Sequence, residues 1–145
     1  MTEETCDVLI IGAGTAGCVI AGRLSESGRH SVCVLEAGPP DRNPFIHIPA
    51  GVLYTLKNPA INWMYKGAGS PGLGGRAIDH ARGKTLGGSG SINGHIYNRG
   101  QRADFDLWAE QGNRGWGYED VLPYFRKSER RIGGGDAGYH GTDGP

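Results

Sequence analysis

The first forty residues alternate most clearly between apolar runs and turn residues. Val8–Ile11 is a continuous apolar run, which predicts a strand buried on both faces. Apolar residues then recur at helical spacing from Ala16 to Leu24, and Gly28 is well placed to end that helix. Val32–Leu35 has the pattern of a second buried strand. This order predicts an α/β fold that begins with a βαβ unit of about 30 residues.

The middle of the chain loses this periodicity. Five prolines between residues 38 and 59 predict an extended surface segment with short turns. Residues 63–67 and 76–81 have the composition of two short strands, and the connection between them is rich in glycine and proline. We therefore expect a hairpin here, followed by a second glycine-rich loop over residues 82–94.

Two short helices are predicted in the last third of the chain. The first covers residues 103–111 and ends at Gly112, and the second covers residues 118–129. The apolar positions of the second helix predict a buried face made of Val121, Leu122, Tyr124 and Phe125. Residues 133–145 are nearly all turn formers.

Composition narrows the possible functions. Fifteen basic and fifteen acidic residues balance, so charge gives no argument for nucleic acid or an anionic membrane as partner. The 27 glycines far exceed the roughly 10 that average usage gives, and they indicate tight turns and close approaches of backbone to a ligand. The polar start and the lack of a long apolar run predict a cytoplasmic protein, with any membrane association left to other parts of a longer protein.

A dinucleotide site is predicted at the first glycine-rich turn. Residues 12–17 read G-x-G-x-x-G between a strand and a helix, and Glu36 closes the second strand. In such a site Gly14 lets a pyrophosphate approach the backbone and Gly17 lets helix and strand pack closely. N–H groups at the helix start face the pyrophosphate, and the carboxylate accepts the ribose hydroxyls. This motif alone is compatible with both NAD and FAD.

The second glycine-rich loop favours FAD over NAD. Residues 82–93, RGKTLGGSGSIN, resemble the first signature of the glucose–methanol–choline (GMC) oxidoreductases, and the spacing onward to Tyr97, Gly100 and Asp106 agrees with it. The stretches VLEAGP, NWMY, DFDLWAEQGNRGWGYEDVLPYFRKSE and HGTDGP look like the N-terminal half of the same family. The resemblance implies a Rossmann-like FAD-binding fold of the GMC type, of which this chain supplies the N-terminal portion.

The resemblance also divides the chain into segments. We expect a βαβ dinucleotide unit over 1–37, an extended segment and hairpin over 38–81, a flavin loop over 82–106, and helices with a turn-rich end over 107–145. The substrate domain and the catalytic C-terminal part are expected to lie outside these residues.

Glycines, hydroxyls and an amide in the two loops are suited to a pyrophosphate and a flat flavin ring. The residues expected to bind FAD, partly from the motifs and partly from the resemblance, are Gly12, Gly14, Thr15, Ala16, Gly17, Glu36, Ala37, Trp63, Arg82, Gly83, Leu86, Gly87, Gly88, Ser89, Asn93, Gly94, His95 and Ile96. Some family members attach FAD covalently through a histidine, but this chain has Ile92 at that place, so we expect non-covalent FAD. The histidines show no metal-ligand spacing, and no metal is expected.

The implied activity is oxidation of a CH–OH group of a small alcohol by hydride transfer to flavin, with oxygen or a quinone-type compound as electron acceptor. The family's catalytic base is a histidine far beyond Pro145, so no catalytic residue is expected here, and a second chain could carry the C-terminal part. The alternatives are a non-catalytic fragment that binds FAD or ADP, and a GMC-fold lyase that uses FAD structurally. Arg99 and Arg102 are expected to pair with Asp104 or Asp106 rather than to clamp a phosphate.

Overall fold

The computed structural model describes residues 4–145. The chain divides into two compact units, Met1–Ile96 and Tyr97–Pro145. The boundary falls inside the segment 82–106. Each unit is described by itself below.

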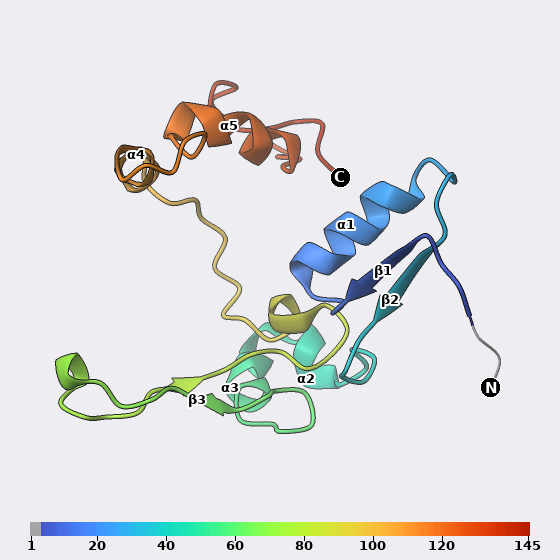
Figure 1. Cartoon of the computed structure of the whole chain (residues 1–145), viewed down its shortest axis with the longest axis vertical. Helices are drawn as coiled ribbons and strands as arrows, with labels where there is room; N and C mark the ends of the chain where they lie inside the picture. The colour runs from blue at the N-terminus through green and yellow to red at the C-terminus, as the bar shows by residue number, and fades with distance from the viewer. Residues whose placement is uncertain (1–3) are drawn as a thin grey trace. The chain divides into compact units, whose positions relative to one another are not determined.

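The first unit opens with the predicted βαβ arrangement. Strands β1 (Val8–Ile11) and β2 (Val32–Leu35) pair in parallel, with Val8 opposite Val32. Helix α1 (Thr15–Ser25) connects them and runs along the strand pair (Figure 1). Gly28 follows the helix with a φ of +64°, a conformation that costs glycine little. The predicted strands and helix are confirmed, with the same strand bounds.

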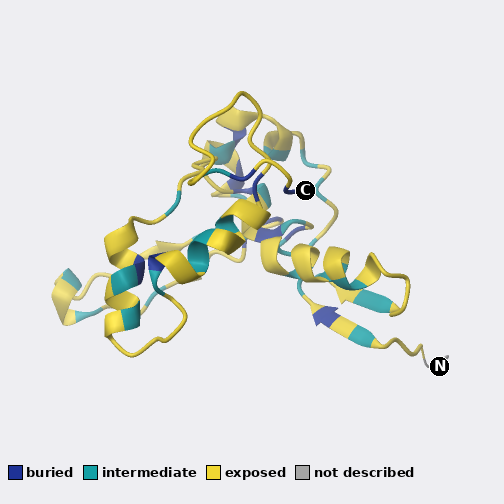
Figure 2. Cartoon of the chain, turned by 90° about the horizontal axis from the view of Figure 1, so that it is seen from above, coloured by how far each residue is buried: buried dark blue, intermediate teal, exposed yellow. Residues whose placement is uncertain are grey.

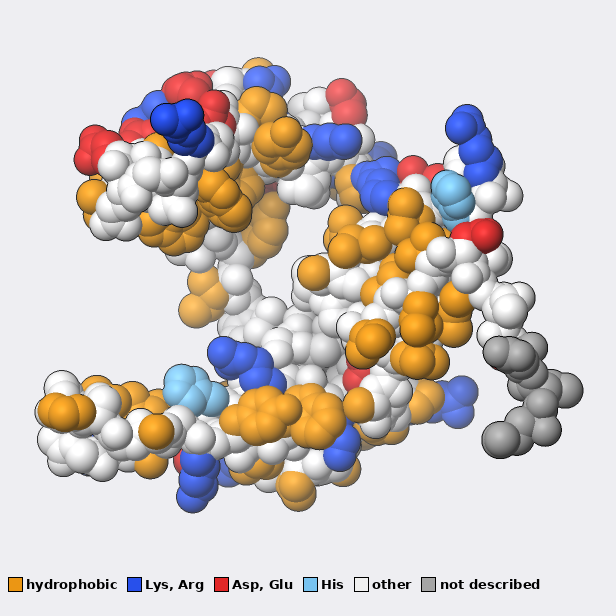
Figure 3. All heavy atoms as spheres, viewed as in Figure 1, with side chains coloured by type: hydrophobic (Ala, Val, Ile, Leu, Met, Phe, Trp, Pro, Cys, Tyr) orange, Lys and Arg blue, Asp and Glu red, His pale blue; other side chains and the backbone are white. Residues whose placement is uncertain are grey.

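The βαβ unit is far more exposed than its sequence predicts. Leu9 and Ile11 in β1 are 53% and 84% exposed, and Val19 and Ile20 in α1 are also exposed. Hydrophobic side chains gather over this region in Figure 3, and Figure 2 shows little buried surface there. The prediction that these strands are buried on both faces is therefore wrong for the described residues, because two strands and one helix cannot cover each other.

The proline-rich segment folds into short helices, contrary to the predicted extended run. Helix α2 (Pro44–His47), the 3-10 helix η1 (Pro49–Gly51) and helix α3 (Val52–Thr55) follow one another. Proline stands first in α2 and in η1, where its missing N–H costs nothing. The side chain of Asn43 caps α2 by accepting the Phe45 N–H at 3.0 Å. Pro44 and Pro49, which were expected to exclude helices, therefore start α2 and η1.

The predicted hairpin is present but short. Strands β3 (Tyr65–Lys66) and β4 (Asp79–His80) pair in antiparallel fashion, and the 3-10 helix η2 (Pro71–Leu73) lies in the connection. A further bridge joins Asn62 to Gly83 and extends the pairing toward the second glycine loop. That loop contains the 3-10 helix η3 (Gly88–Ser91).

The second unit contains helices α4 (Arg102–Glu110) and α5 (Tyr118–Lys127), close to the two predicted helices. A side chain joins them, because an Asp106 carboxylate oxygen accepts the Tyr118 N–H at 2.9 Å at the start of α5. Gly112, with a φ of +99°, follows α4 as predicted. Asp104 accepts the Gln101 N–H at 2.9 Å and so caps α4.

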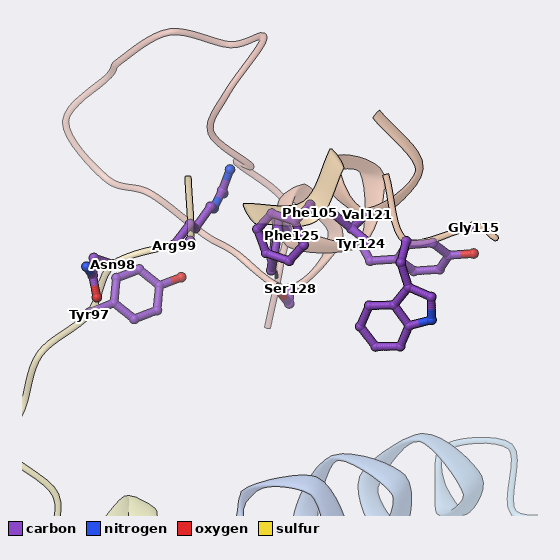
Figure 4. A pocket seen from close by; sticks show the side chains of 11 residues that line it. Tyr97, Asn98, Arg99, Phe105, Gly115, Val121, Tyr124, Phe125 and Ser128 are labelled. Atoms are coloured by element: carbon purple, nitrogen blue, oxygen red, sulfur yellow. Dashed lines mark hydrogen bonds between the residues drawn. The ribbon is translucent and has the colours of Figure 1, made fainter. Parts of the chain in front are cut away.

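Aromatic rings form the core of this unit. Phe105 is buried, and its ring centre lies 5.5 Å from that of Trp108, 5.5 Å from that of Phe125 and 6.2 Å from that of Tyr118. The buried face predicted for α5 is only partly right. Tyr124 is 71% exposed, and it lines an open groove of about 660 Å³ beside Phe125 (Figure 4).

Glu129 ties the end of the second unit together. Its carboxylate accepts from Arg99 at 2.7 Å, from the Gly141 N–H at 2.9 Å and from His140 at 3.1 Å. The predicted arginine partners are therefore wrong, because Arg99 pairs with Glu129 and Arg102 pairs with Glu119. Both carboxylates come from residues distant in sequence, which spacing alone does not reveal. Within residues 4–145, no helix combines the length and apolar character needed to span a bilayer.

Candidate cofactor-binding site

A cleft of about 410 Å³ lies in the first unit where the two glycine loops meet. The predicted site residues that line it are Gly12, Gly14, Glu36, Ala37, Trp63, Arg82, Gly83, Gly88 and Ser89. Three further lining residues were not predicted, namely Ile11, Leu35 and Tyr65. The rule that ligands bind at the carboxyl ends of parallel strands would have found Ile11 and Leu35, since they end β1 and β2.

The first glycine turn has the geometry that its motif predicts. Gly12 has a φ of +98°, and its N–H donates to the Leu35 carbonyl at 2.7 Å. A Cβ atom on Gly17 would overlap the Gly12 carbonyl oxygen. Helix and turn therefore pack so closely that only glycine fits at position 17.

Helix α1 presents its N-terminus at this turn. The first i to i−4 hydrogen bond of this helix runs from the Cys18 N–H to the Gly14 carbonyl at 2.9 Å. The N–H groups of Thr15, Ala16 and Gly17 consequently have no partner within the helix. These donors and the positive end of the helix dipole favour a negatively charged group such as a pyrophosphate.

Glu36 holds the turn as well as facing the cleft. One carboxylate oxygen accepts the Ala13 N–H at 2.8 Å, and the other accepts the Gly38 N–H at 2.9 Å. Each oxygen keeps a further lone pair with which to accept a hydroxyl proton. The residue can therefore position the first glycine turn and still bind ribose hydroxyls, as its sequence position predicts.

The second glycine loop lies directly against the first. The Gly87 N–H donates to the Ala13 carbonyl at 2.8 Å, and Gly14 and Gly87 form a parallel bridge. A Cβ atom on Gly88 would come within 2.8 Å of the Gly14 Cα, and Gly88 has a φ of +58°. The two loops form one surface because neither carries a side chain at this contact.

Trp63 and Arg82 form another wall of the cleft. The Trp63 N–H donates to the Arg82 carbonyl at 2.9 Å. The Trp63 ring stacks on Tyr65, with ring centres 5.8 Å apart and planes 5° apart, and Lys84 Nζ lies 5.0 Å from the Trp63 ring centre. The cleft therefore combines a flat aromatic surface with nearby positive charge.

Two buried polar residues that adjoin Trp63 and Lys84 in the sequence were not predicted as site residues. Asn62 is 2% exposed and Thr85 is fully buried. The Thr85 hydroxyl donates to the Pro39 carbonyl at 2.8 Å, which ties the second glycine loop to the segment after Glu36. Both residues lie in stretches that carry the family resemblance, Asn62 in NWMY and Thr85 in RGKTLGGSGSIN, but the resemblance implies no cofactor contact for either of them.

Several predicted site residues do not line the cleft. Thr15, Ala16 and Gly17 form the first turn of α1, and Leu86 and Gly87 lie in the second glycine loop.

Residues 93–96 are exposed at the end of the first unit, and none of them lines the cleft. The Asn93 side chain accepts the His95 N–H at 2.9 Å, and His95 has a φ of +58°. The FAD contacts of Asn93, Gly94, His95 and Ile96 stay predictions.

The chain belongs to the GMC oxidoreductase family, whose model matches residues 6–140. A curated relative, the oxygen-dependent choline dehydrogenase of Vibrio vulnificus (strain YJ016), is 50% identical over 143 residues, which are 99% of this chain and 25% of the relative. The corresponding protein of Brucella suis biovar 1 is 48% identical over 139 residues, which are 96% of this chain and 25% of the relative. The chain thus spans about a quarter of the length of these relatives.

Solved structures give the same family. Pyridoxine 4-oxidase from Mesorbium loti superposes with a TM-score of 0.84 at 38% identity, over 97% of this chain and 27% of that one. A formate oxidase of Aspergillus oryzae RIB40, studied for the effect of a mutation on FAD modification, gives a TM-score of 0.82 at 34% identity, over 100% of this chain and 27% of that one. The fold is accordingly the N-terminal FAD-binding portion of a GMC flavoenzyme, as the sequence predicts.

Proposed function

We propose that this chain supplies the FAD-binding site of an enzyme that oxidises the CH–OH group of a small alcohol. The observation that carries the proposal is the contact of two glycine loops at one cleft, beside the carboxylate of Glu36. The first loop is built for a pyrophosphate, and the second offers a surface without side chains to a flat ring. A glycine turn with a purely structural role would need neither an open cleft nor a second loop against it.

The described residues fit the adenosine diphosphate half of FAD. The α1 N-terminus would hold the pyrophosphate, Gly14 would let it approach the backbone, and Glu36 would accept the ribose hydroxyls. When bound, FAD supplies the acceptor for a hydride from the alcohol. Arg82 lines the cleft, and Lys84 Nζ lies 5.0 Å from the ring centre of Trp63 in its wall. Their positive charge favours an anionic flavin ring over a neutral one.

The names of relatives suggest substrate and acceptor. The curated relatives are oxygen-dependent choline dehydrogenases, and the structural neighbours include oxidases of pyridoxine and formate. We propose choline or another small alcohol as substrate and oxygen as electron acceptor, with a quinone-type acceptor as the alternative. The base that removes the hydroxyl proton would come from later sequence or from a second chain. The cytoplasmic location stays a prediction.

We also propose that FAD is held without a covalent bond. Ile92, at the place where some family members carry the linking histidine, is buried with 3% exposure. His95 is exposed and lies outside the cleft lining. Denaturing the flavin-loaded protein with acid should release all of the flavin into the supernatant, and flavin retained in the precipitated protein would contradict this proposal.

The decisive experiment is an FAD titration of the flavin-free protein followed by tryptophan fluorescence, with Glu36→Ala as a comparison. Saturable binding at one FAD per chain, weakened at least tenfold by Glu36→Ala, is the expected result. Oxygen consumption with choline then tests the substrate, on a protein that includes the catalytic part. Failure of the wild-type protein to bind FAD would overturn the proposed function.

A further inference from the structure

Asn62 is a buried side chain whose hydrogen bonds all go to the backbone around the cleft. Its amide Nδ2 donates to the Leu56 carbonyl at 2.8 Å. Its Oδ1 accepts from the Met64 N–H at 3.0 Å and from the Arg82 N–H at 3.0 Å. One side chain therefore connects the end of α3, the start of the hairpin and the start of the second glycine loop.

The bond to Met64 supports an unusual backbone conformation. Met64 has a φ of +54°, in the left-handed region that residues other than glycine rarely adopt. Accepting an N–H two residues ahead is how asparagine stabilises a tight turn. Without Oδ1, the Met64 N–H would lose this partner and the turn would lose its support.

The bond to Arg82 positions the opposite strand. Asn62 and Gly83 form an antiparallel bridge, in which the Trp63 N–H donates to the Arg82 carbonyl at 2.9 Å and the Lys84 N–H donates to the Ile61 carbonyl at 2.8 Å. Oδ1 of Asn62 therefore holds the two backbone segments that carry Trp63 and Arg82. Both of those residues line the cleft, whereas Asn62 itself does not.

We propose that Asn62 is a positioning residue of the FAD site, which fixes Trp63 and Arg82 as one wall of the cleft without touching the cofactor. This inference rests on the proposed function, because it assigns the cleft to FAD. An apolar side chain could fill the same space, but it would leave one carbonyl and two N–H groups without these partners in a part-buried region. The requirement is thus for the acceptor oxygen and not for the volume.

The test compares substitutions that separate these two requirements. Asn62→Leu keeps the branched skeleton of the side chain and removes all three bonds. Asn62→Asp keeps an oxygen that can accept from Met64 and Arg82, and its second oxygen can donate to the Leu56 carbonyl only when it is protonated. The control is Asn58→Ala, because Asn58 lies four residues earlier, accepts the Ala60 N–H at 3.0 Å and does not line the cleft. FAD affinity is measured by tryptophan fluorescence, and thermal melting checks that each flavin-free variant is folded at the temperature used.

We expect Asn62→Leu to weaken FAD binding at least tenfold and Asn62→Asp to restore it to within about threefold of wild type, with Asn58→Ala unchanged. Amide hydrogen exchange of the flavin-free protein should show faster exchange at Met64 and Arg82 in Asn62→Leu only. If wild type binds FAD and Asn62→Leu binds it equally well, the positioning role fails and the proposed function stands. Unchanged exchange at Met64 and Arg82 in Asn62→Leu would likewise overturn the positioning role. If wild type binds no FAD, the proposed function fails and the inference fails with it.

Discussion

The two units of this chain are held together by different kinds of contact. In the first unit, Gly17, Gly83 and Gly88 lie so close to neighbouring backbone that a Cβ atom would collide, and the buried polar side chains Asn62 and Thr85 bond to backbone. The second unit also has close backbone contacts, at Gly141 and Gly144. Its buried contacts include pairs of side chains, in the aromatic cluster around Phe105 and in the ion pair of Arg99 with Glu129. The close contact of the two glycine loops leaves part of the cleft surface free of side chains, as a flat cofactor needs, whereas aromatic side chains such as Tyr124 and Phe125 line the groove of the second unit.

Two glycines in α1 provide the sharpest test of this difference. A Cβ atom on Gly17 would overlap the Gly12 carbonyl oxygen, whereas one on Gly22 would meet nothing within 4 Å. We expect Gly17→Ala to lower the free energy of unfolding of the first unit by more than about 3 kcal/mol, at the upper end of overpacking effects, and to abolish FAD binding. Gly22→Ala, in the same helix, should stabilise it by up to about 1 kcal/mol.

Urea unfolding followed by circular dichroism measures both changes, and an FAD titration measures the effect on the site. Equal stabilities of the two alanine variants would contradict the close approach of helix and turn.

The second largest effect is expected in the aromatic cluster. Phe105→Ala removes a ring that contacts Trp108, Tyr118 and Phe125. We expect a loss of about 3 kcal/mol, near the lower end for phenylalanine, because Phe105 also borders the open groove (Figure 4). Hydrogen exchange should quicken in peptides from α4 and α5 and stay unchanged in peptides from β1 and α1. Faster exchange in both units would show that the clusters are not independent.

The sequence predicts the first unit's site better than the second unit's contacts, for a physical reason. A glycine motif between a strand and a helix fixes local backbone geometry, so Gly12, Gly14 and Glu36 could be placed from spacing alone. The pairing of Arg99 with Glu129 depends on how the turn-rich end folds back, which no local pattern encodes. Asn62 was missed for the same reason, since its partners Leu56 and Arg82 come together only in the folded chain.

The exposure of the βαβ unit could not be predicted from its composition. A continuous apolar strand such as Val8–Ile11 indicates what the side chains prefer to contact, and it does not indicate whether the described residues supply that contact. The short helices of the proline-rich segment are a different case. Pro44 and Pro49 stand where a helix tolerates proline best, so a rule that treats proline only as a helix breaker fails there.

Acid should weaken the second unit through Glu129. The N–H of Gly141, together with His140 and Arg99, lowers the pKa of this carboxyl below its ordinary value of 4.5. A carboxyl with a lowered pKa in the folded state stabilises that state above the unfolded pKa, and this stabilisation is lost as the pH falls through the folded pKa. We expect the protection of amides around Gly141, measured relative to their intrinsic exchange rate at each pH, to fall below about pH 4.5.

Glu129→Gln is the matching variant, since it keeps an oxygen for the Gly141 N–H and removes the charge. It should lower the melting temperature at pH 7 and make it less sensitive to acid. Asp7 in the first unit also has a lowered pKa, caused by hydrogen bonds from Ser31. Exchange in peptides of the second unit, rather than the melting temperature of the whole chain, therefore isolates the effect of Glu129. An acid response of those peptides that is the same in wild type and Glu129→Gln would assign it to another group.

The smallest effect is expected for an ion pair in the first unit. Arg23 and Glu26 approach to 2.7 Å on α1, but their side chains are 48% and 60% exposed, whereas those of Arg99 and Glu129 are 7% and 9% exposed. Solvent screens the exposed pair, so Arg23→Ala should cost no more than about 0.5 kcal/mol and leave FAD affinity unchanged. Arg99→Ala should cost clearly more, because it leaves the Glu129 carboxylate without its cation and removes the guanidinium from the Phe125 and Tyr139 rings. Urea unfolding at low and at high salt separates the two pairs, since only the small contribution of Arg23 should shrink when salt is added. A loss at Arg23 as large as that at Arg99 would mean that the exposed pair and the buried pair stabilise their units alike, and buried contacts between side chains would then not distinguish the second unit.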